Sequence, residues 1–223
     1  MGLLGPILAV VQKDLLLELR NREIILALLV FSGIVLIIFN FAVDLTTYNA
    51  GGVGPGVLWV AITFASVIGL NRSFLIEKEG GALEGLMLTP VGRDTLLAGK
   101  VLSNFIFITI AEAATVPAFA VLFNVNVLRP EMLVVGFIAA AGLASAGTLF
   151  SAITINTRGR EIMLPLLFLP IIAPLLIALV EATVEIVDGN SWSGASQWLK
   201  IGAGFDVIFI VISMAAFQFV LED

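Results

Sequence analysis

Charged residues are unusually dense in one short segment of this chain. Residues 76–94 read IEKEGGALEGLMLTPVGRD, and six of these nineteen positions are charged, against 13% of the whole chain. Gly80-Gly81 interrupts a helix, and Thr89-Pro90 ends one because proline drives the preceding residue out of the helical region. Between them lies the short apolar stretch ALEGLML. The pattern predicts either an element that docks on another protein or an ordinary loop joining two helices.

Several kinds of chemistry are excluded because the residues for them are absent. The chain has no histidine and no cysteine, so it lacks the commonest general base and metal ligand, and it has no thiols. Gly99-Lys100 is the nearest approach to a phosphate-binding loop, but Val101 follows it, and Asp94 stands where the first glycine belongs. The glycine cluster at 51–56 is predicted to be a turn. The chain is therefore not predicted to be an enzyme, and any ATP it uses must be hydrolysed by a separate subunit.

The composition indicates a membrane protein. Hydrophobic residues make up 60% of the 223 positions, whereas soluble domains contain about half. A helix of about 20 apolar residues crosses a bilayer. Six runs qualify, at about 24–43, 57–76, 101–123, 132–155, 162–180 and 205–221. We expect an all-α integral membrane protein with six transmembrane helices in a single permease-like domain over 1–223.

The distribution of Lys and Arg predicts the orientation. Nine lie in the segments before span one and after spans two and four, and two lie in the opposite loops. The excess of positive charge marks the cytoplasmic side, so both termini are expected there, in a multi-pass protein of the cytoplasmic (inner) membrane. Residues 1–23 are expected to form an amphipathic helix that lies in the membrane interface or packs on a partner.

Glu112 is a carboxyl placed midway along the third span, five residues before Pro117. A charge at that depth costs about 3 kcal/mol on insertion scales. Glu112 therefore has either a functional role or a structural one, in satisfying backbone groups loosened by Pro117. Span four carries small residues on one face, suited to close helix packing within the subunit or across a dimer: Gly136, Ala140, Ala144 and Thr148.

Residues 181–204 are predicted to form a helical segment on the periplasmic side. Glu181 and Glu185 share one helical face there, and Trp192 and Trp198 suit interfacial anchors. This segment either meets a periplasmic partner or seals the outer face of the bundle. Before it, three prolines in span five predict a bent or broken helix.

Several stretches resemble a known family. The pattern EKEGGALEGLMLTP followed by RD and GK resembles a signature of ABC exporter permeases of the second type. The resemblance narrows to the CcmB-type haem exporter protein B of cytochrome c maturation on four stretches in the expected order. These are GVLWVAITFASVIGLNRSF (56–74), ALEGLMLTPV (82–91), SAGTLFSAITINTRGREIMLPLLFLP (145–170) and FDVIF (205–209). Gly80-Gly81 departs from the acidic or arginine residue expected before the glycine.

The resemblance implies a permease subunit of an ATP-driven ABC transporter for cytochrome c biogenesis. It implies that residues 77–100 form a cytoplasmic coupling loop that fits a cleft in a separate CcmA-type ATPase subunit, where ATP and Mg²⁺ bind. The residues assigned to docking are Glu77, Glu79, Gly81, Leu83, Glu84, Leu86, Met87 and Pro90.

The resemblance also implies partners that handle haem: a CcmC-type membrane subunit, a small CcmD-type membrane subunit and a periplasmic CcmE-type haem chaperone, with a second copy of this chain. Haem ligands are His, Cys, Met or Tyr, and this chain offers only Tyr48 and a few Met. We therefore expect no cofactor bound by this chain, and no nucleic acid. The function is either haem export or release of the haem-loaded chaperone. The alternatives are a permease for a lipid-linked glycan or drug and a proton-coupled secondary transporter, which would need paired intramembrane acids.

Overall fold

The computed structural model describes residues 4–20, 22–42, 50–75, 92–155, 157, 159–190 and 192–220. Within these ranges all regular structure is helical. The helices are α1 (Leu4–Arg20), α2 (Arg22–Ala42), α3 (Ala50–Arg72), α6 (Arg93–Phe123), α7 (Pro130–Thr154), α8 (Arg160–Val187) and α9 (Trp192–Val220). Helices α3, α6, α7, α8 and α9 are each long and apolar enough to cross a membrane, and α2 contains a shorter apolar stretch, Leu26–Ala42. The prediction of an all-α membrane protein is confirmed, and each of the six predicted spans overlaps one helix.

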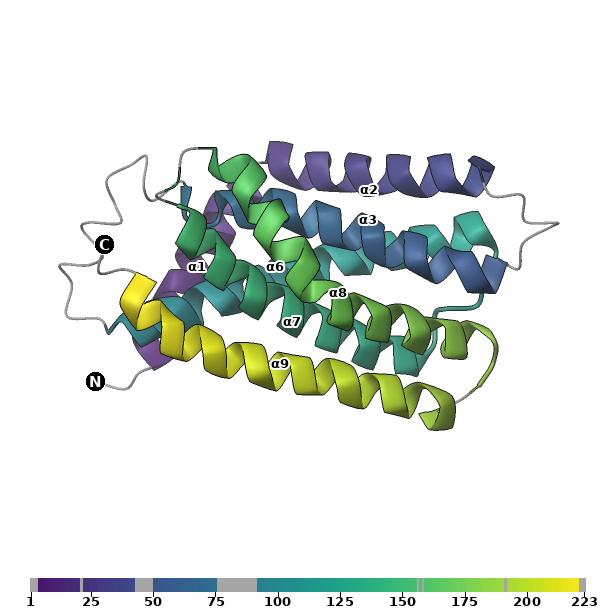
Figure 1. Ribbon diagram of the computed structural model, residues 1–223. Helices are drawn as coiled ribbons and strands as arrows, with labels where there is room; N and C mark the ends of the chain where they lie inside the picture. The colour runs from purple at the N-terminus through teal and green to yellow at the C-terminus, as the bar shows by residue number, and fades with distance from the viewer. Residues whose placement is uncertain are drawn as a thin grey trace.

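The long helices lie side by side in one bundle (Figure 1). α3 ends and α6 begins at the end of the bundle where α1 lies and where α9 finishes; we call this the proximal end. The turn between α8 and α9 lies at the opposite, distal end. Helix α1, the end of α9 and both flanks of the undescribed residues 76–91 therefore share one end of the bundle.

Helix α7 is the centre of the bundle and contacts α3, α6, α8 and α9. Ala140, Ala144 and Thr148 are fully buried, so this part of the small-residue face packs within the subunit rather than across a dimer. A Cβ added at Gly147 would overlap the side chain of Leu70 on α3. Small residues let helix backbones approach closely in lipid, where van der Waals contact is a main source of association.

Hydrogen bonds donated by buried polar side chains also join the helices. Trp59 Nε1 on α3 donates to Thr183 Oγ1 on α8 at 2.9 Å, and Ser151 Oγ on α7 donates to the Leu70 carbonyl of α3 at 2.7 Å. Each such bond in a membrane protein contributes about 0.6 kcal/mol on average. These bonds fix the rotational register of α3 against α7 and α8.

The turn predicted at 51–56 is wrong, because these residues form the first part of α3. A Cβ on Gly54 would lie 3.0 Å from Phe119 Cζ and 3.4 Å from Phe123 Cδ1. The absence of a side chain therefore lets the two aromatic rings of α6 pack against α3. Here tertiary packing overrides the low helix propensity of glycine.

The residues from 181 onward do not form a helix of their own. Residues 181–187 continue α8 to its end, and α9 begins at Trp192. Pro165, Pro170 and Pro174 do not break α8, although Figure 1 shows its first half inclined to its second half. Proline is tolerated in membrane helices because neighbouring groups satisfy the freed backbone. α9 begins at Trp192 rather than near 205, which places Asp206 near the middle of that helix.

Candidate functional site

Of the predicted coupling segment, residues 77–100, the structure describes residues 92–100, where Arg93 begins α6. The eight residues assigned to docking lie outside the described residues: Glu77, Glu79, Gly81, Leu83, Glu84, Leu86, Met87 and Pro90. The frame around these residues consists of the end of α3, through Leu75, and the start of α6, from Gly92, with α1 packed across α6.

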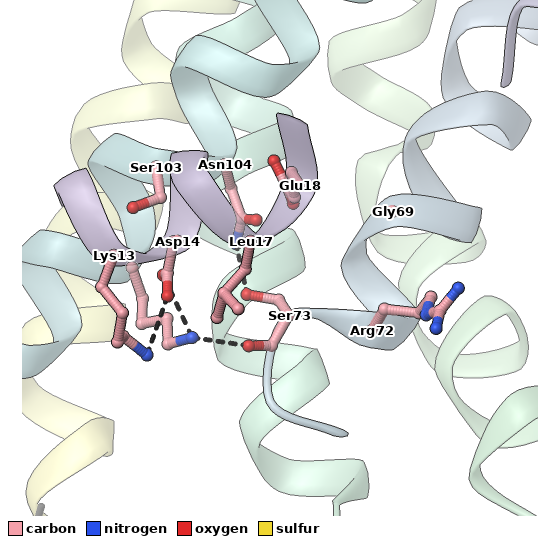
Figure 2. A pocket seen from close by; sticks show the side chains of 10 residues that line it. Lys13, Asp14, Leu17, Glu18, Gly69, Arg72, Ser73, Ser103 and Asn104 are labelled. Atoms are coloured by element: carbon pink, nitrogen blue, oxygen red, sulfur yellow. Dashed lines mark hydrogen bonds and ion pairs between the residues drawn. The ribbon is translucent and has the colours of Figure 1, made fainter. Parts of the chain in front are cut away.

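A single buried lysine joins the three elements of this frame, and Figure 2 shows two of the residues that it contacts, Asp14 and Ser73. Lys100 on α6 is 2% exposed, and its Nζ lies 3.1 Å from Asp14 Oδ2 on α1. The same ammonium donates to the Ser73 carbonyl, just after α3, at 2.6 Å, and lies 5.1 Å from the centre of the Phe74 ring. Lys100 therefore ties α1, the end of α3 and α6 together next to both flanks of the coupling segment.

Asn104 extends the frame to the central helix. Its Nδ2 donates to Ser73 Oγ at 3.1 Å and to Thr148 Oγ1 on α7 at 2.8 Å. Asp14 also pairs with Lys13, whose Nζ lies 2.9 Å from Oδ1. A displacement of the end of α3 would thus reach α1, α6 and α7 through direct bonds.

Helix α1 packs on the subunit through one face and leaves another face outward. Val10 is buried, and a Cβ on Gly99 of α6 would lie 2.7 Å from Val10 Cβ. Leu8 and Leu16 remain 60% and 52% exposed. The predicted amphipathic helix is therefore present, with its inner face on α6 and its outer apolar residues available to lipid or a partner.

Glu18 gives the frame a group that titrates near neutral pH. Burial and the nearby Asp14 carboxylate raise its pKa to about 7, and Lys100 opposes them. The hollow among Asp14, Glu18, Arg72 and Lys100 measures about 20 Å³, which is room for about one water. A hollow of this size is too small to bind a substrate, so these side chains are better suited to holding the helices together.

Glu112 lies on α6 against the central helix. It is 5% exposed, and its Oε1 has no hydrogen-bond partner in the described part of the chain. A Cβ on Gly136 of α7 would lie 3.0 Å from Glu112 Oε2, so the glycine makes room for the carboxyl.

Asp206 is a second buried carboxyl, which the sequence analysis missed. It is 7% exposed on α9, its Oδ1 has no hydrogen-bond partner among the described residues, and a side chain on Gly142 of α7 would overlap it. The sign of it in the sequence was the acid in FDVIF, one residue after the predicted start of the sixth span at 205. Each of the two acids therefore packs against a different glycine of α7.

The distal residues predicted from 181 onward come together at the α8–α9 turn. Asn190 Nδ2 donates to Glu185 Oε2 at 2.9 Å, and Gly194 of α9 leaves space for that carboxylate. Glu181 is half-buried one turn earlier. Trp192 is 46% exposed, whereas Trp198 packs against the core. Glu185 thus stabilises the turn.

Comparison with known proteins gives a consistent result. The sequence model of the CcmB protein family matches residues 6–222. The chain is 29% identical over 172 residues to heme exporter protein B of Pseudomonas aeruginosa, covering 77% of each chain. It is 23% identical over 188 residues to heme exporter protein B of Bradyrhizobium diazoefficiens, covering 84% of this chain and 85% of the relative. For heme exporter protein B of Rhodobacter capsulatus, the identity is 28% over 170 residues, covering 76% and 78%.

Proposed function

Because this chain belongs to the CcmB family, we propose that it is the membrane-spanning permease subunit of an ATP-driven ABC transporter for cytochrome c biogenesis in the bacterial inner membrane. The family match over residues 6–222 carries this proposal, and the bundle of long apolar helices supports it. The sequence holds no phosphate-binding loop, so the subunit is not an enzyme, and a separate CcmA-type subunit hydrolyses the ATP.

The frame supports a mechanism in which the ATPase presses on residues 77–100. Movement of the ATPase displaces the end of α3 and the start of α6, which flank the undescribed part of this segment. Lys100 passes the displacement to α1 through Asp14, and Asn104 passes it to the central helix through Thr148. A buried ion pair and a buried hydrogen bond between helices can transmit such a displacement, because packed helices move as units.

The positive residues around the proximal end support a cytoplasmic position for that end and for both termini. The distal end then faces the periplasm, where Glu181, Glu185, Trp192 and Trp198 lie around the α8–α9 turn. A displacement transmitted through the helices to the distal end drives either haem export or release of a haem-loaded CcmE-type chaperone. The relatives' name, heme exporter protein B, supports haem as the molecule that the complex handles.

The partners proposed for this subunit are a CcmA-type ATPase, a CcmC-type membrane subunit, a small CcmD-type subunit and a second copy of the chain. Haem is held by the CcmC-type membrane subunit and the CcmE-type periplasmic chaperone, because this chain, and therefore a second copy of it, has no His or Cys. Among the described residues, no group of three or more Asp or Glu side chains could hold a metal ion.

Charge reversal in the coupling segment tests the proposal. Glu84→Lys is expected to leave membrane abundance unchanged while ATP turnover by the complex no longer produces mature cytochrome c. Gly81→Phe, which adds bulk, is expected to act in the same way. Lys200→Glu on the exposed part of α9 is the matched charge reversal and should retain maturation. Normal cytochrome c levels in the Glu84 and Gly81 variants, or failure of any ATPase to co-purify, would refute the assignment.

A further inference from the structure

A groove follows the outer seam between α6 and α7, and in its proximal part Ile210, Ser213 and Met214 of α9 also line it. It consists of two hollows, of about 570 Å³ toward the distal end and about 360 Å³ toward the proximal end. Phe105 and Phe137 line both hollows, and their rings stand edge to face between them, 5.3 Å apart. We call this feature the α6–α7 groove.

The rim of the groove is apolar and faces outward. Leu133, Phe137 and Leu128 are 77%, 63% and 62% exposed. In a membrane-spanning bundle such residues meet either lipid or another protein. The groove therefore opens sideways into the bilayer.

The floor of the distal hollow holds a carboxyl that lacks a partner. Glu112 lines the hollow and is 5% exposed, and its Oε1 makes no hydrogen bond within the described ranges. It lies about midway along the apolar stretch of α6. Lipid acyl chains offer neither donors nor acceptors at such a depth, and an unsatisfied polar group there is costly. A complementary group has to come from something that reaches the middle of the membrane.

We propose that the α6–α7 groove receives a transmembrane helix of another membrane subunit, which presents a hydrogen-bond donor to Glu112. This inference rests on the proposed function, because it assumes that the permease works within a complex of membrane subunits. The donor is a Ser, Thr, Asn, Gln, Tyr, Trp or Lys side chain near the midpoint of the incoming helix. Glu112 accepts its hydrogen bond.

The dimensions of the groove favour a helix over a lipid. Its lining extends from Asp94 to Pro117 on α6, which at 1.5 Å per residue is about 35 Å and matches the apolar thickness of a bilayer. Ala113, Gly136 and Ala141 lie along it, and such small residues permit close approach of a second backbone. A phospholipid carries its polar groups at the interface and would leave Glu112 unsatisfied.

A second copy of this chain is a poorer occupant. A two-fold contact through the same groove is self-complementary, so each Glu112 would need its donor from the groove of the other copy. The hydroxyl nearest to Glu112 along that lining, Thr109, already donates to the Phe105 carbonyl at 2.8 Å. The groove therefore indicates a different subunit.

A photo-cross-linking amino acid placed at Leu133 in the assembled complex, in native membranes, tests this assignment. Val211 on α9 is the matched position, because it is 60% exposed and lines neither hollow. We expect the Leu133 adduct to be a peptide from a transmembrane segment of another subunit, within one helical turn of a polar side chain. Adducts only with lipid, only with this chain, or with no peptide at all would overturn the proposal.

Variants at Glu112 test the hydrogen bond itself. Glu112→Leu should reduce the adduct at Leu133 at least about fivefold, and Glu112→Gln, which keeps an acceptor, should leave it within about twofold. Asp206→Leu removes the other buried carboxyl and should not change the adduct. If Glu112→Leu does not accumulate, Ala113→Trp fills the hollow and should cause the same loss, with Val211→Trp as its control.

An unchanged adduct in the Glu112 and Ala113 variants would overturn the proposal. Co-purification of the ATPase distinguishes a failure of the proposed function from a failure of the proposal for the α6–α7 groove. Its absence would refute the proposed function, whereas its retention without a helix adduct would refute only the occupant of the groove.

Discussion

Asp14→Asn is expected to destabilise the subunit strongly, because it leaves the Lys100 ammonium buried without the carboxylate it pairs with. Nζ and Oδ2 are 3.1 Å apart. At an effective dielectric constant of about 20, two unit charges at that separation attract by about 5 kcal/mol. Desolvation of the two ions offsets most of this, so the intact pair contributes little net stability. Removal of one partner is different, and the expected loss is about 3 kcal/mol.

Lys100→Met is expected to cost less, about 1–2 kcal/mol, because Asp14 keeps Lys13 at 2.9 Å. The double variant Asp14→Leu/Lys100→Met should recover to within about 1 kcal/mol of the parent protein, since it removes both charges of this ion pair. The assay is reversible unfolding in mixed micelles of the parent, the two single variants and the double variant. Lys200→Gln, an exposed lysine, serves as the control and should change stability by less than about 0.5 kcal/mol.

The reasoning would be refuted if Asp14→Asn unfolded like the parent protein. It would also be refuted if the double variant were no more stable than Asp14→Asn. Either result would mean that Lys100 does not carry an uncompensated charge at this position in the frame.

Three further predictions concern the frame and the core. The pKa of Glu18 is about 7 in the folded state against an ordinary 4.5, so the folded state binds more protons than the unfolded state between these pH values. The stability that Glu18 contributes therefore falls as the pH rises from about 4.5 to 7. The difference in unfolding free energy between the parent protein and Glu18→Gln should change over the same pH range and should be constant above about pH 8. Gly142→Ala should destabilise the subunit by about 1–3 kcal/mol, because the new Cβ would overlap Asp206 and Leu175. The control Gly33→Ala places its Cβ where nothing lies within 4 Å and should be neutral or stabilising. Equal melting temperatures of the Gly142→Ala and Gly33→Ala variants would contradict the close packing of α7 and α9. Trp59→Phe should lose about 0.6–1.7 kcal/mol with the hydrogen bond to Thr183, and Thr183→Val in the same background should add no further loss; additive losses would show that the two side chains do not interact.

The docking assignment remains a prediction from the sequence and the family resemblance, because residues 76–91 lie outside the described residues. The sequence located Glu112 correctly within a span, since a lone acid in an apolar run is visible without coordinates. The sequence led to no prediction for Asp206, because the sixth span was predicted to begin at 205 whereas α9 begins at Trp192. The sequence placed Lys100 in a rejected phosphate loop, in the charge bias and in the family signature. It did not indicate an ion pair, since no local pattern shows that a lysine pairs with an acid 86 positions earlier.

The sequence by itself determined the class of the protein, because burial in lipid depends on runs of apolar side chains that can be counted along the chain. It also determined the approximate position of each span and the expected side of the termini. Tertiary structure alone decided which polar groups meet: Lys100 with Asp14, Asn104 with Thr148, and each buried acid with its own glycine on α7. These pairings depend on how each helix is rotated about its axis and how closely it approaches its neighbours, and both are set by the packing of all the helices together.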